Sequence, residues 1–322
     1  MGKLVAGFLL FLAGFLLLRR SGARWAAEGG QPLVRRYLGR TGPAFAVALL
    51  ATACLHSSSA FLTLLLGLAE SGAIPTVAAL AATLGANVGT TATALLASLP
   101  VPRRALFFTG TLFFVAGARF RRFRWLWIRA GRSGAGKCSS LADFGLLLLG
   151  LGILLAGLDL LAAQAASLTE WKPFADLLAV SGNPALGVLG GAVSSAVLQS
   201  STLLVSLLTG LLRSGKLVLE DAVAIVVGAN IGTTADVLVA SALARPEARR
   251  VAFGHLLINV LGAGAFLVCP NILTRPLAGQ NPARALAYAH TLFNLGGLLL
   301  WPLLPNLAGL LERVSKGEER QR

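Results

Sequence analysis

Two clusters of hydroxyl side chains and two glycine-asparagine-threonine segments hold the polar groups best suited to chemistry in this chain. Residues 56–59 read His-Ser-Ser-Ser, and residues 199–202 read Gln-Ser-Ser-Thr. Residues 85–91 read Gly-Ala-Asn-Val-Gly-Thr-Thr, and residues 228–234 read Gly-Ala-Asn-Ile-Gly-Thr-Thr. Serine hydroxyls beside a helix N-terminus, where unpaired N–H groups carry about half a positive charge, suit an anion. Asparagine and threonine oxygens, together with freed backbone carbonyls, suit Na⁺.

These four segments are two copies of one unit. Residues 56–91 and 199–234 align without a gap at a constant offset of 143 positions (199 minus 56). Serine, glycine, asparagine and threonine positions agree better than the apolar positions between them, whereas two unrelated apolar spans would show the reverse. The sequence therefore predicts an internal duplication.

Composition indicates a membrane protein. The chain is 56% hydrophobic and only 13% charged, whereas soluble domains carry about 25% charged residues. Apolar runs such as 141–162 and 251–269 have the roughly 20-residue length that a bilayer core requires. The formal net charge of +15 is concentrated in short basic clusters beside such runs, at residues 19–40, 119–137, 245–250 and 313–322. That distribution follows the positive-inside rule and argues against nucleic acid as a partner.

Element lengths predict an all-α, polytopic membrane fold with two inverted-topology repeats. The serine clusters divide 41–72 and 184–213 into arms too short to cross a bilayer, so each copy predicts a re-entrant helical hairpin. The spans that follow, 76–99 and 217–241, are expected to be broken at their glycine-asparagine-threonine segments. Placing the large basic clusters in the cytoplasm gives the two repeats opposite orientations and a shared site at mid-membrane.

The predicted organisation is a single membrane domain covering residues 1–322. Its parts are a first repeat at 41–118, a basic cytoplasmic loop at 119–140, a second repeat at 182–270, a final transmembrane span region at 271–304 and a polar C-terminal tail at 305–322. A first span at 4–18 is preferred over a cleaved signal peptide, because Arg19 and Arg20 stand where a cleavage site should lie.

The paired motifs resemble those of the type II sodium-dependent phosphate cotransporters and their bacterial relatives. That family carries a duplicated Gln-Ser-Ser-Ser motif, each followed further along the chain by Gly-Ala-Asn-Ile-Gly-Thr-Thr. The resemblance covers about 41–118 and 182–304. It implies secondary active transport of inorganic phosphate with Na⁺ as the co-transported ion and no other cofactor. It also implies a multi-pass protein of the bacterial inner membrane.

The same resemblance implies roles for the matching residues. The phosphate-binding set would be His56, Ser57, Ser58, Ser59, Gln199, Ser200, Ser201 and Thr202. The sodium-binding set would be Asn87, Thr90, Thr91, Asn230, Thr233, Thr234 and Asp236. Two positions depart from the family, since His56 replaces glutamine and Thr202 replaces serine. The His56 ring could be a neutral hydrogen-bonding group or a titrating one, and its presence leaves another small anion open as the substrate.

Three further polar features have competing explanations. Asp236 is a functional candidate as an intramembrane carboxylate, for Na⁺ or for a proton, but a partnered packing role is comparably expected. The pairs His255/Asn259 and His290/Asn294 share a spacing that puts both side chains on one helix face. We expect these pairs to form interhelical hydrogen bonds rather than to bind ligands.

Other functional classes are less consistent with the sequence. An enzyme is not expected, because no Gly-x-Ser-x-Gly elbow is present and no carboxylate is placed to orient His56. The small residues of the motifs could simply let helices pack closely, but their recurrence in both copies favours a site. The alternatives to phosphate cotransport are transport of another small anion, or a non-transporting membrane sensor or assembly subunit that keeps the fold. Expected partners are inorganic phosphate, Na⁺ and the lipid bilayer, with a homodimer left open.

Overall fold

The computed structural model describes residues 2–25, 37–99, 138–170 and 182–320, with isolated positions between 105 and 115 and at 172. Every regular element in these residues is a helix, so the predicted all-α class is confirmed. The predicted basic loop at 119–140 lies outside the described residues except for its last three positions, which begin a helix. Most of the predicted span at 103–118 also lies outside them.

Five helical stretches in the described part of the chain are long and apolar enough to cross a bilayer. They are Thr76–Ser98, Gly145–Gln164, Leu219–Ser241, Pro246–Val268 and Pro282–Ser315. The hairpin helices are shorter, with 13 or 15 residues each. At 1.5 Å per residue such helices measure about 20 to 23 Å, less than the bilayer core of about 30 Å. The lengths therefore agree with hairpins that enter and leave on one side.

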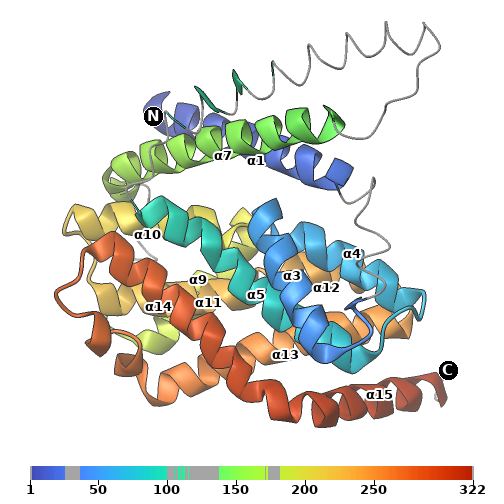
Figure 1. Ribbon diagram of the computed structural model, residues 1–322. Coiled ribbons are helices and arrows are strands. Elements are labelled where there is room, and N and C mark those ends of the chain that lie inside the picture. The colour runs from blue at the N-terminus through green and yellow to red at the C-terminus, as the bar shows by residue number, and fades with distance from the viewer. Residues whose placement is uncertain are drawn as a thin grey trace, which may run out of the picture. The chain divides into compact units, whose positions relative to one another are not determined.

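The chain forms two compact units, residues 1–33 with 100–161 and residues 34–99 with 162–322. In the first unit α1 (Gly2–Trp25) and α7 (Cys138–Gln164) lie side by side (Figure 1). A Cβ atom added to Gly14 would lie 2.3 Å from the backbone nitrogen of Leu154. One added to Gly157 would lie 2.4 Å from that of Phe11. Glycine is thus required where these two backbones approach each other.

The second unit contains both copies of the duplicated segment. The first copy consists of α3 (Thr41–Leu55), α4 (Ser58–Glu70) and α5 (Thr76–Ser98). The second consists of α9 (Pro184–Leu198), α10 (Ser201–Arg213), α11 (Leu219–Gly232) and α12 (Ala235–Ser241). The unit continues with α13 (Pro246–Val268), α14 (Pro282–Gly296), a 3₁₀ segment Gly297–Leu303 and α15 (Leu304–Arg320). Most of the predicted polar tail is therefore helical.

The backbone repeats its conformation at the 143-residue offset. His56 and Gln199, between the two hairpin arms, are both left-handed, with φ of 49° and 50°. Gly72 and Gly215, after the second arm, both have φ of 69°. The duplication read from the sequence thus extends to the backbone angles of the turns.

The motif glycines let the long helix of each copy pack against the first hairpin arm. A Cβ atom on Gly85 would lie 2.2 Å from the carbonyl oxygen of Phe45. One on Gly228 would lie 1.8 Å from the carbonyl oxygen of Val188. Phe45 and Val188 are themselves equivalent at the same offset, so both copies use one crossing between helices.

The expected helix break appears in the second copy and is absent from the first. Residues 233 and 234 form a turn between α11 and α12, whereas α5 runs without interruption from Thr76 to Ser98. Glycine and threonine disfavour a helix only weakly, and tertiary packing routinely overrides such preferences. The first arm packs against the motif glycines in both copies, so this packing does not distinguish the continuous helix from the interrupted one.

Candidate functional site

The serine cluster of the first copy caps the N-terminus of α4. Ser57 has an extended backbone, and its hydroxyl oxygen accepts a hydrogen bond of 3.2 Å from the backbone N–H of Ala60. The N–H groups of the first two helical residues, Ser58 and Ser59, have no partner within the helix by geometry. Ser57 is buried, and the side chains of Ser58 and Ser59 are half-buried. This tip therefore offers N–H donors, hydroxyl donors and the positive end of a helix dipole.

The second copy repeats this cap on α10. The Ser200 hydroxyl oxygen accepts a hydrogen bond of 3.2 Å from the backbone N–H of Leu203. Ser201 is buried, whereas Thr202 is half-buried and Gln199 is exposed. Eight of the predicted site residues thus lie at two equivalent helix N-termini. Because the left-handed backbone costs a non-glycine residue about 1–2 kcal/mol, its presence before both caps indicates a conformation imposed by the surrounding structure.

His56 connects the first tip to the long helix behind it. Its Nδ1 atom lies 2.6 Å from the hydroxyl oxygen of Thr93, which is buried in α5. The equivalent positions in the second copy are Gln199 and Asp236, so the copies differ in both members of this pair. Asp236 is half-buried and accepts a hydrogen bond of 2.7 Å from the backbone N–H of Val237.

The asparagine of the first motif lies in a closed hydrogen-bond network, which we call the first network (Asn87, His255 and Asn259). Asn259 Nδ2 donates to the backbone carbonyl of His255 at 3.2 Å, so Asn259 Oδ1 is free to accept from Asn87 Nδ2 at 3.0 Å. Asn87 Oδ1 must then be the acceptor in its 2.9 Å contact with His255 Nε2. The ring therefore carries its proton on Nε2. All three side chains are buried.

The second motif has a similar but looser arrangement, the second network (Asn230, His290 and Asn294). Asn294 Nδ2 donates to the backbone carbonyl of His290 at 3.2 Å, as in the first network. However, His290 Nε2 lies 3.4 Å from Asn230 Oδ1. Asn230 Nδ2 donates at 2.9 Å to the carbonyl of Val226 in its own helix. The predicted interhelical contacts are thus made by His255 and Asn259 in the first pair and by His290 in the second, and their partners are the two motif asparagines.

The threonines of the motifs use their hydroxyl hydrogens within their own helices. Thr90 and Thr91 donate to the carbonyls of Ala86 and Val88. Thr233 and Thr234 donate to the carbonyls of Asn230 and Ile231. Because a hydroxyl oxygen keeps two lone pairs after donating its hydrogen, each remains able to bind a cation.

Two buried hydroxyls that the sequence reading missed lie against the motifs. Thr52 in α3 and Ser195 in α9 are equivalent at the 143-residue offset and fully buried. They pack against Gly89 and Gly232, and neither hydroxyl has a hydrogen-bond partner among the described residues. A polar residue four positions before each tip was the available signal.

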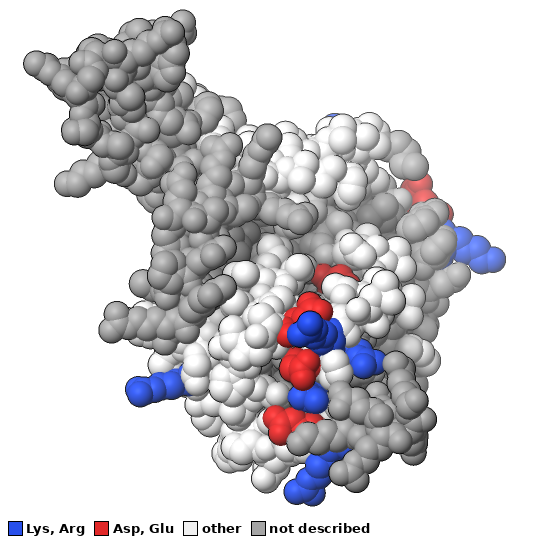
Figure 2. Space-filling view, turned by 90° about the vertical axis from the view of Figure 1, so that its right-hand side faces the viewer, with Lys and Arg blue, Asp and Glu red and all other residues white. Residues whose placement is uncertain are grey.

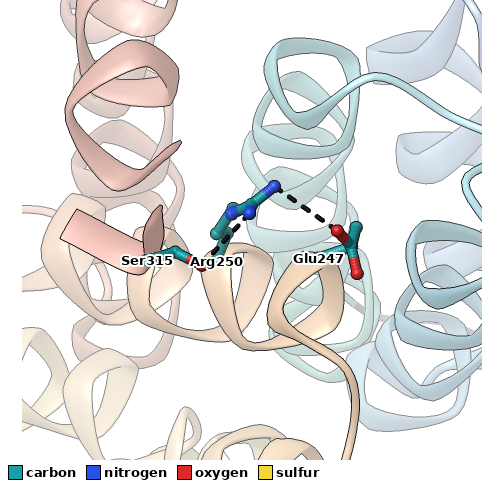
Figure 3. A network of polar contacts seen from close by, with 3 residues as sticks. All are labelled: Glu247, Arg250 and Ser315. Atoms are coloured by element: carbon teal, nitrogen blue, oxygen red, sulfur yellow. Dashed lines mark hydrogen bonds and ion pairs between the residues drawn. The ribbon is translucent and has the colours of Figure 1, made fainter. Parts of the chain in front are cut away.

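Charged side chains gather on one face of the described part of the chain. Figure 2 shows one face, where the described Lys, Arg, Asp and Glu residues form a strip among uncharged residues. One charged network joins α13 to α15: Arg250 contacts Glu247 at 3.6 Å and donates to the hydroxyl of Ser315 at 3.1 Å (Figure 3). The backbone N–H of Arg245 donates to Glu70 at the end of α4. Neither the serine tips nor the glycine-asparagine-threonine segments contain a lysine or arginine.

Elements of the two copies contact each other in the second unit. Helix α5 of the first copy touches α10 of the second and also α14, and α13 touches both α5 and α11. The two long motif helices therefore share neighbours. Within the described residues, no hydrogen bond joins the first serine tip to the second.

Comparison with known proteins identifies relatives of the whole duplicated region. The model of the Na⁺/Pi-cotransporter family matches the chain twice, over residues 10–163 and 153–299. The "Uncharacterized protein YqeW" of Bacillus subtilis is 28% identical over 305 residues, which cover 93% of this chain and 92% of that protein. No solved structure gives a significant match.

Further relatives carry a functional name. The "Putative inorganic phosphate export protein YjbB" of Escherichia coli K12 is 26% identical over 281 residues, covering 85% of this chain and 48% of YjbB. The protein of the same name in Salmonella typhimurium is 26% identical over 285 residues, with the same coverage. The chain thus spans about half the length of the YjbB proteins.

Proposed function

Because the chain belongs to the Na⁺/Pi-cotransporter family, we propose that it carries inorganic phosphate across the bacterial inner membrane together with Na⁺. The observation that supports this most is the pair of serine-capped helix N-termini, Ser57 on α4 and Ser200 on α10, repeated with the same backbone angles. Two such ends supply the donors that a phosphate group requires without a fixed positive charge.

Phosphate would bind through the two tips. The N–H groups at the start of α4 and α10 and the hydroxyls of Ser58, Ser59, Ser201 and Thr202 are the donors. Gln199 and His56, each one residue before a cap, would close the site from the side. The hydroxyl oxygens of Ser57 and Ser200 would hold the helix ends in place, while their O–H groups remain able to donate to phosphate.

Na⁺ would bind at the glycine-asparagine-threonine segments. The hydroxyl oxygens of Thr90, Thr91, Thr233 and Thr234, the amide oxygens of Asn87 and Asn230, and the Asp236 carboxylate are hard oxygen ligands. Asn87 Oδ1 accepts one hydrogen bond, and its second lone pair can still bind an ion. The turn between α11 and α12 would add backbone carbonyls.

Coupling between the two substrates would follow from charge. Since no lysine or arginine lies in the motif segments, a phosphate anion there is offset only by helix ends and by Na⁺. Moving an uncompensated charge into a bilayer is costly. We therefore expect phosphate to bind well only when Na⁺ is bound.

The direction of transport has two candidates. The family name indicates cotransport with Na⁺, whereas the YjbB relatives are named for export. Reversing the imposed gradients separates these cases, because a symporter moves phosphate in the direction in which Na⁺ runs. An exporter of another mechanism would move phosphate independently of the Na⁺ gradient.

The test is radiolabelled phosphate uptake into proteoliposomes under an inward Na⁺ gradient or an equal K⁺ gradient. We expect uptake with Na⁺ and little with K⁺. Equal uptake would overturn the coupling, and no flux under any gradient would favour a sensor or assembly subunit. Competition by unlabelled sulfate, arsenate or carboxylates distinguishes phosphate from another small anion as the preferred substrate.

A further inference from the structure

We propose that the two asparagine networks are alternating locks. In this account the closed arrangement passes from one repeat to the other when the transporter changes the side to which its site is open. The inference rests on the proposed function, because transport requires two such conformations. It assigns His255, Asn259, His290 and Asn294 as positioning residues for the two motif asparagines.

The two networks contain the same residue types in the same order but differ in geometry. In the first network, Asn87 is held from both sides, by His255 at 2.9 Å and by Asn259 at 3.0 Å. In the second network, the amide group of Asn230 donates to Val226 of its own helix, and its contact with His290 lengthens to 3.4 Å.

Only the motif asparagine differs between the two networks. Asn259 and Asn294 each donate to the carbonyl of their own histidine at 3.2 Å, so the His-x-x-x-Asn pairs hold equivalent conformations. The pairs on α13 and α14 thus share one local geometry, and the difference lies in how the motif asparagine meets them.

In each copy, how tightly the network is closed goes with whether its motif helix is continuous. The closed first network lies on α5, which is continuous, and the looser second network lies on α11, which ends in the turn at residues 233–234. The two copies thus differ locally at equivalent residues, although Thr233 and Thr234 keep right-handed backbone angles. In a transporter with inverted repeats, exchanging the conformations of the repeats produces the opposite-facing state.

The opposite-facing state follows from this exchange. There α11 and α12 join into one helix with Asn230 held between His290 and Asn294. Helix α5 is then interrupted near Thr90 and Thr91, and Asn87 turns its amide group to its own helix. In each state, the open network would shape the Na⁺ site at its own glycine-asparagine-threonine segment.

The test asks whether weakening the two networks changes the accessibility of the serine tips in opposite directions. Ser59→Cys and Thr202→Cys, equivalent positions at the two tips, are introduced separately with Cys54, Cys138 and Cys269 replaced by serine. A membrane-impermeant maleimide is added to intact cells, and the rate of labelling is measured. His255→Ala weakens the closed network and should change the labelling rate of either tip by about five- to tenfold, the effect of one buried hydrogen bond.

The decisive variant adds His290→Ala to His255→Ala. If the locks oppose each other, the second change reverses the first and returns labelling toward that of the unmodified protein. A shift that stays the same or grows, or no shift with His255→Ala, overturns the proposal. His255→Gln keeps an N–H donor near the Nε2 position and should behave like the unmodified protein. If only the size of the side chain mattered, the donor of glutamine would give it no such advantage.

A second measurement needs no destabilising substitution. Amide hydrogen exchange of the unmodified protein, with and without Na⁺ and phosphate, should show opposite changes in segments 88–93 and 231–236. Parallel changes would overturn the locks. If uptake lacks Na⁺ dependence but labelling reverses, cotransport fails and the locks stand. If uptake depends on Na⁺ but labelling does not reverse, the locks fail alone.

Discussion

Thr52 and Ser195 occupy equivalent places in the two copies, and each buries a hydroxyl that has no hydrogen-bond partner among the described residues. Each packs against the second glycine of its motif, Gly89 or Gly232. A buried hydroxyl without a partner costs about 1–3 kcal/mol, so its presence at both equivalent positions requires an explanation. One explanation is that the hydroxyl donates a hydrogen bond during the transport cycle, when the neighbouring helix moves. Experiment can separate this role from simple packing.

Replacing these hydroxyls should reveal which explanation holds. Thr52→Val and Ser195→Ala remove the hydroxyl with little change of shape, so the resting protein should gain about 1 kcal/mol of stability. Thermal unfolding of the purified protein in detergent measures this. A lower Tm in either variant would show that the hydroxyl already has a stabilising partner. A higher Tm together with slower uptake would show that the hydroxyl serves the cycle.

The motif glycines should tolerate no side chain. Gly85→Ala or Gly228→Ala would place a Cβ atom about 2 Å from a backbone carbonyl oxygen, and the helices must separate. Overpacking of this kind costs about 1–3 kcal/mol, so folded yield and Tm should fall. The matched control is Gly67→Ala in α4, where no atom lies within 4 Å of the new Cβ.

The control should change stability in the opposite direction. Alanine stabilises a helix by about 1 kcal/mol relative to glycine, so Gly67→Ala should raise the Tm slightly. If Gly85→Ala and Gly67→Ala behaved alike, the close helix crossing would be wrong.

Asp236 should govern the affinity for Na⁺ if its carboxylate is a ligand. Asp236→Asn removes the negative charge and keeps the shape, and Asp236→Thr makes the second copy like the first, which has Thr93 there. Both changes should raise the Na⁺ concentration for half-maximal uptake by about tenfold or more. The control is Glu220→Gln at the exposed start of α11, and an equal effect there would indicate a long-range charge effect instead.

The duplication and the helical hairpins were predictable from the sequence because they depend on local patterns. Serine before an apolar run predicts a helix N-terminus, and the structure places Ser57 and Ser200 as caps. The interruption expected in the first copy was wrong, because α5 runs through the motif without a break, and both copies pack a motif glycine against the first hairpin arm. Local propensity could not reveal that crossing.

The partners of Asn87 and Asn230 were also beyond a reading of the sequence alone. The spacing of His255 and Asn259 predicted one helix face and interhelical bonds, but not which helix would receive them. Asn87 and His255 are 168 positions apart, and only the packing of α13 against α5 joins them. The repeat of a polar residue at Thr52 and Ser195 is visible in the sequence, but only the structure shows that their hydroxyls are buried without a partner among the described residues.

The most direct test of the account compares two substitutions of one cap. Asparagine and aspartate replace serine equally well as helix N-caps, so Ser200→Asn and Ser200→Asp should fold alike. They differ in the charge presented where phosphate is proposed to bind. Ser71→Ala with Ser214→Ala, at the other ends of the same two helices, is the control for helix stability.

Na⁺-driven phosphate uptake in proteoliposomes provides the measurement. We expect Ser200→Asp to lose about tenfold or more in uptake relative to Ser200→Asn, while the Ser71→Ala and Ser214→Ala protein matches the unmodified one. Equal uptake by the aspartate and asparagine variants would contradict the assignment of phosphate to the serine-capped helix N-termini.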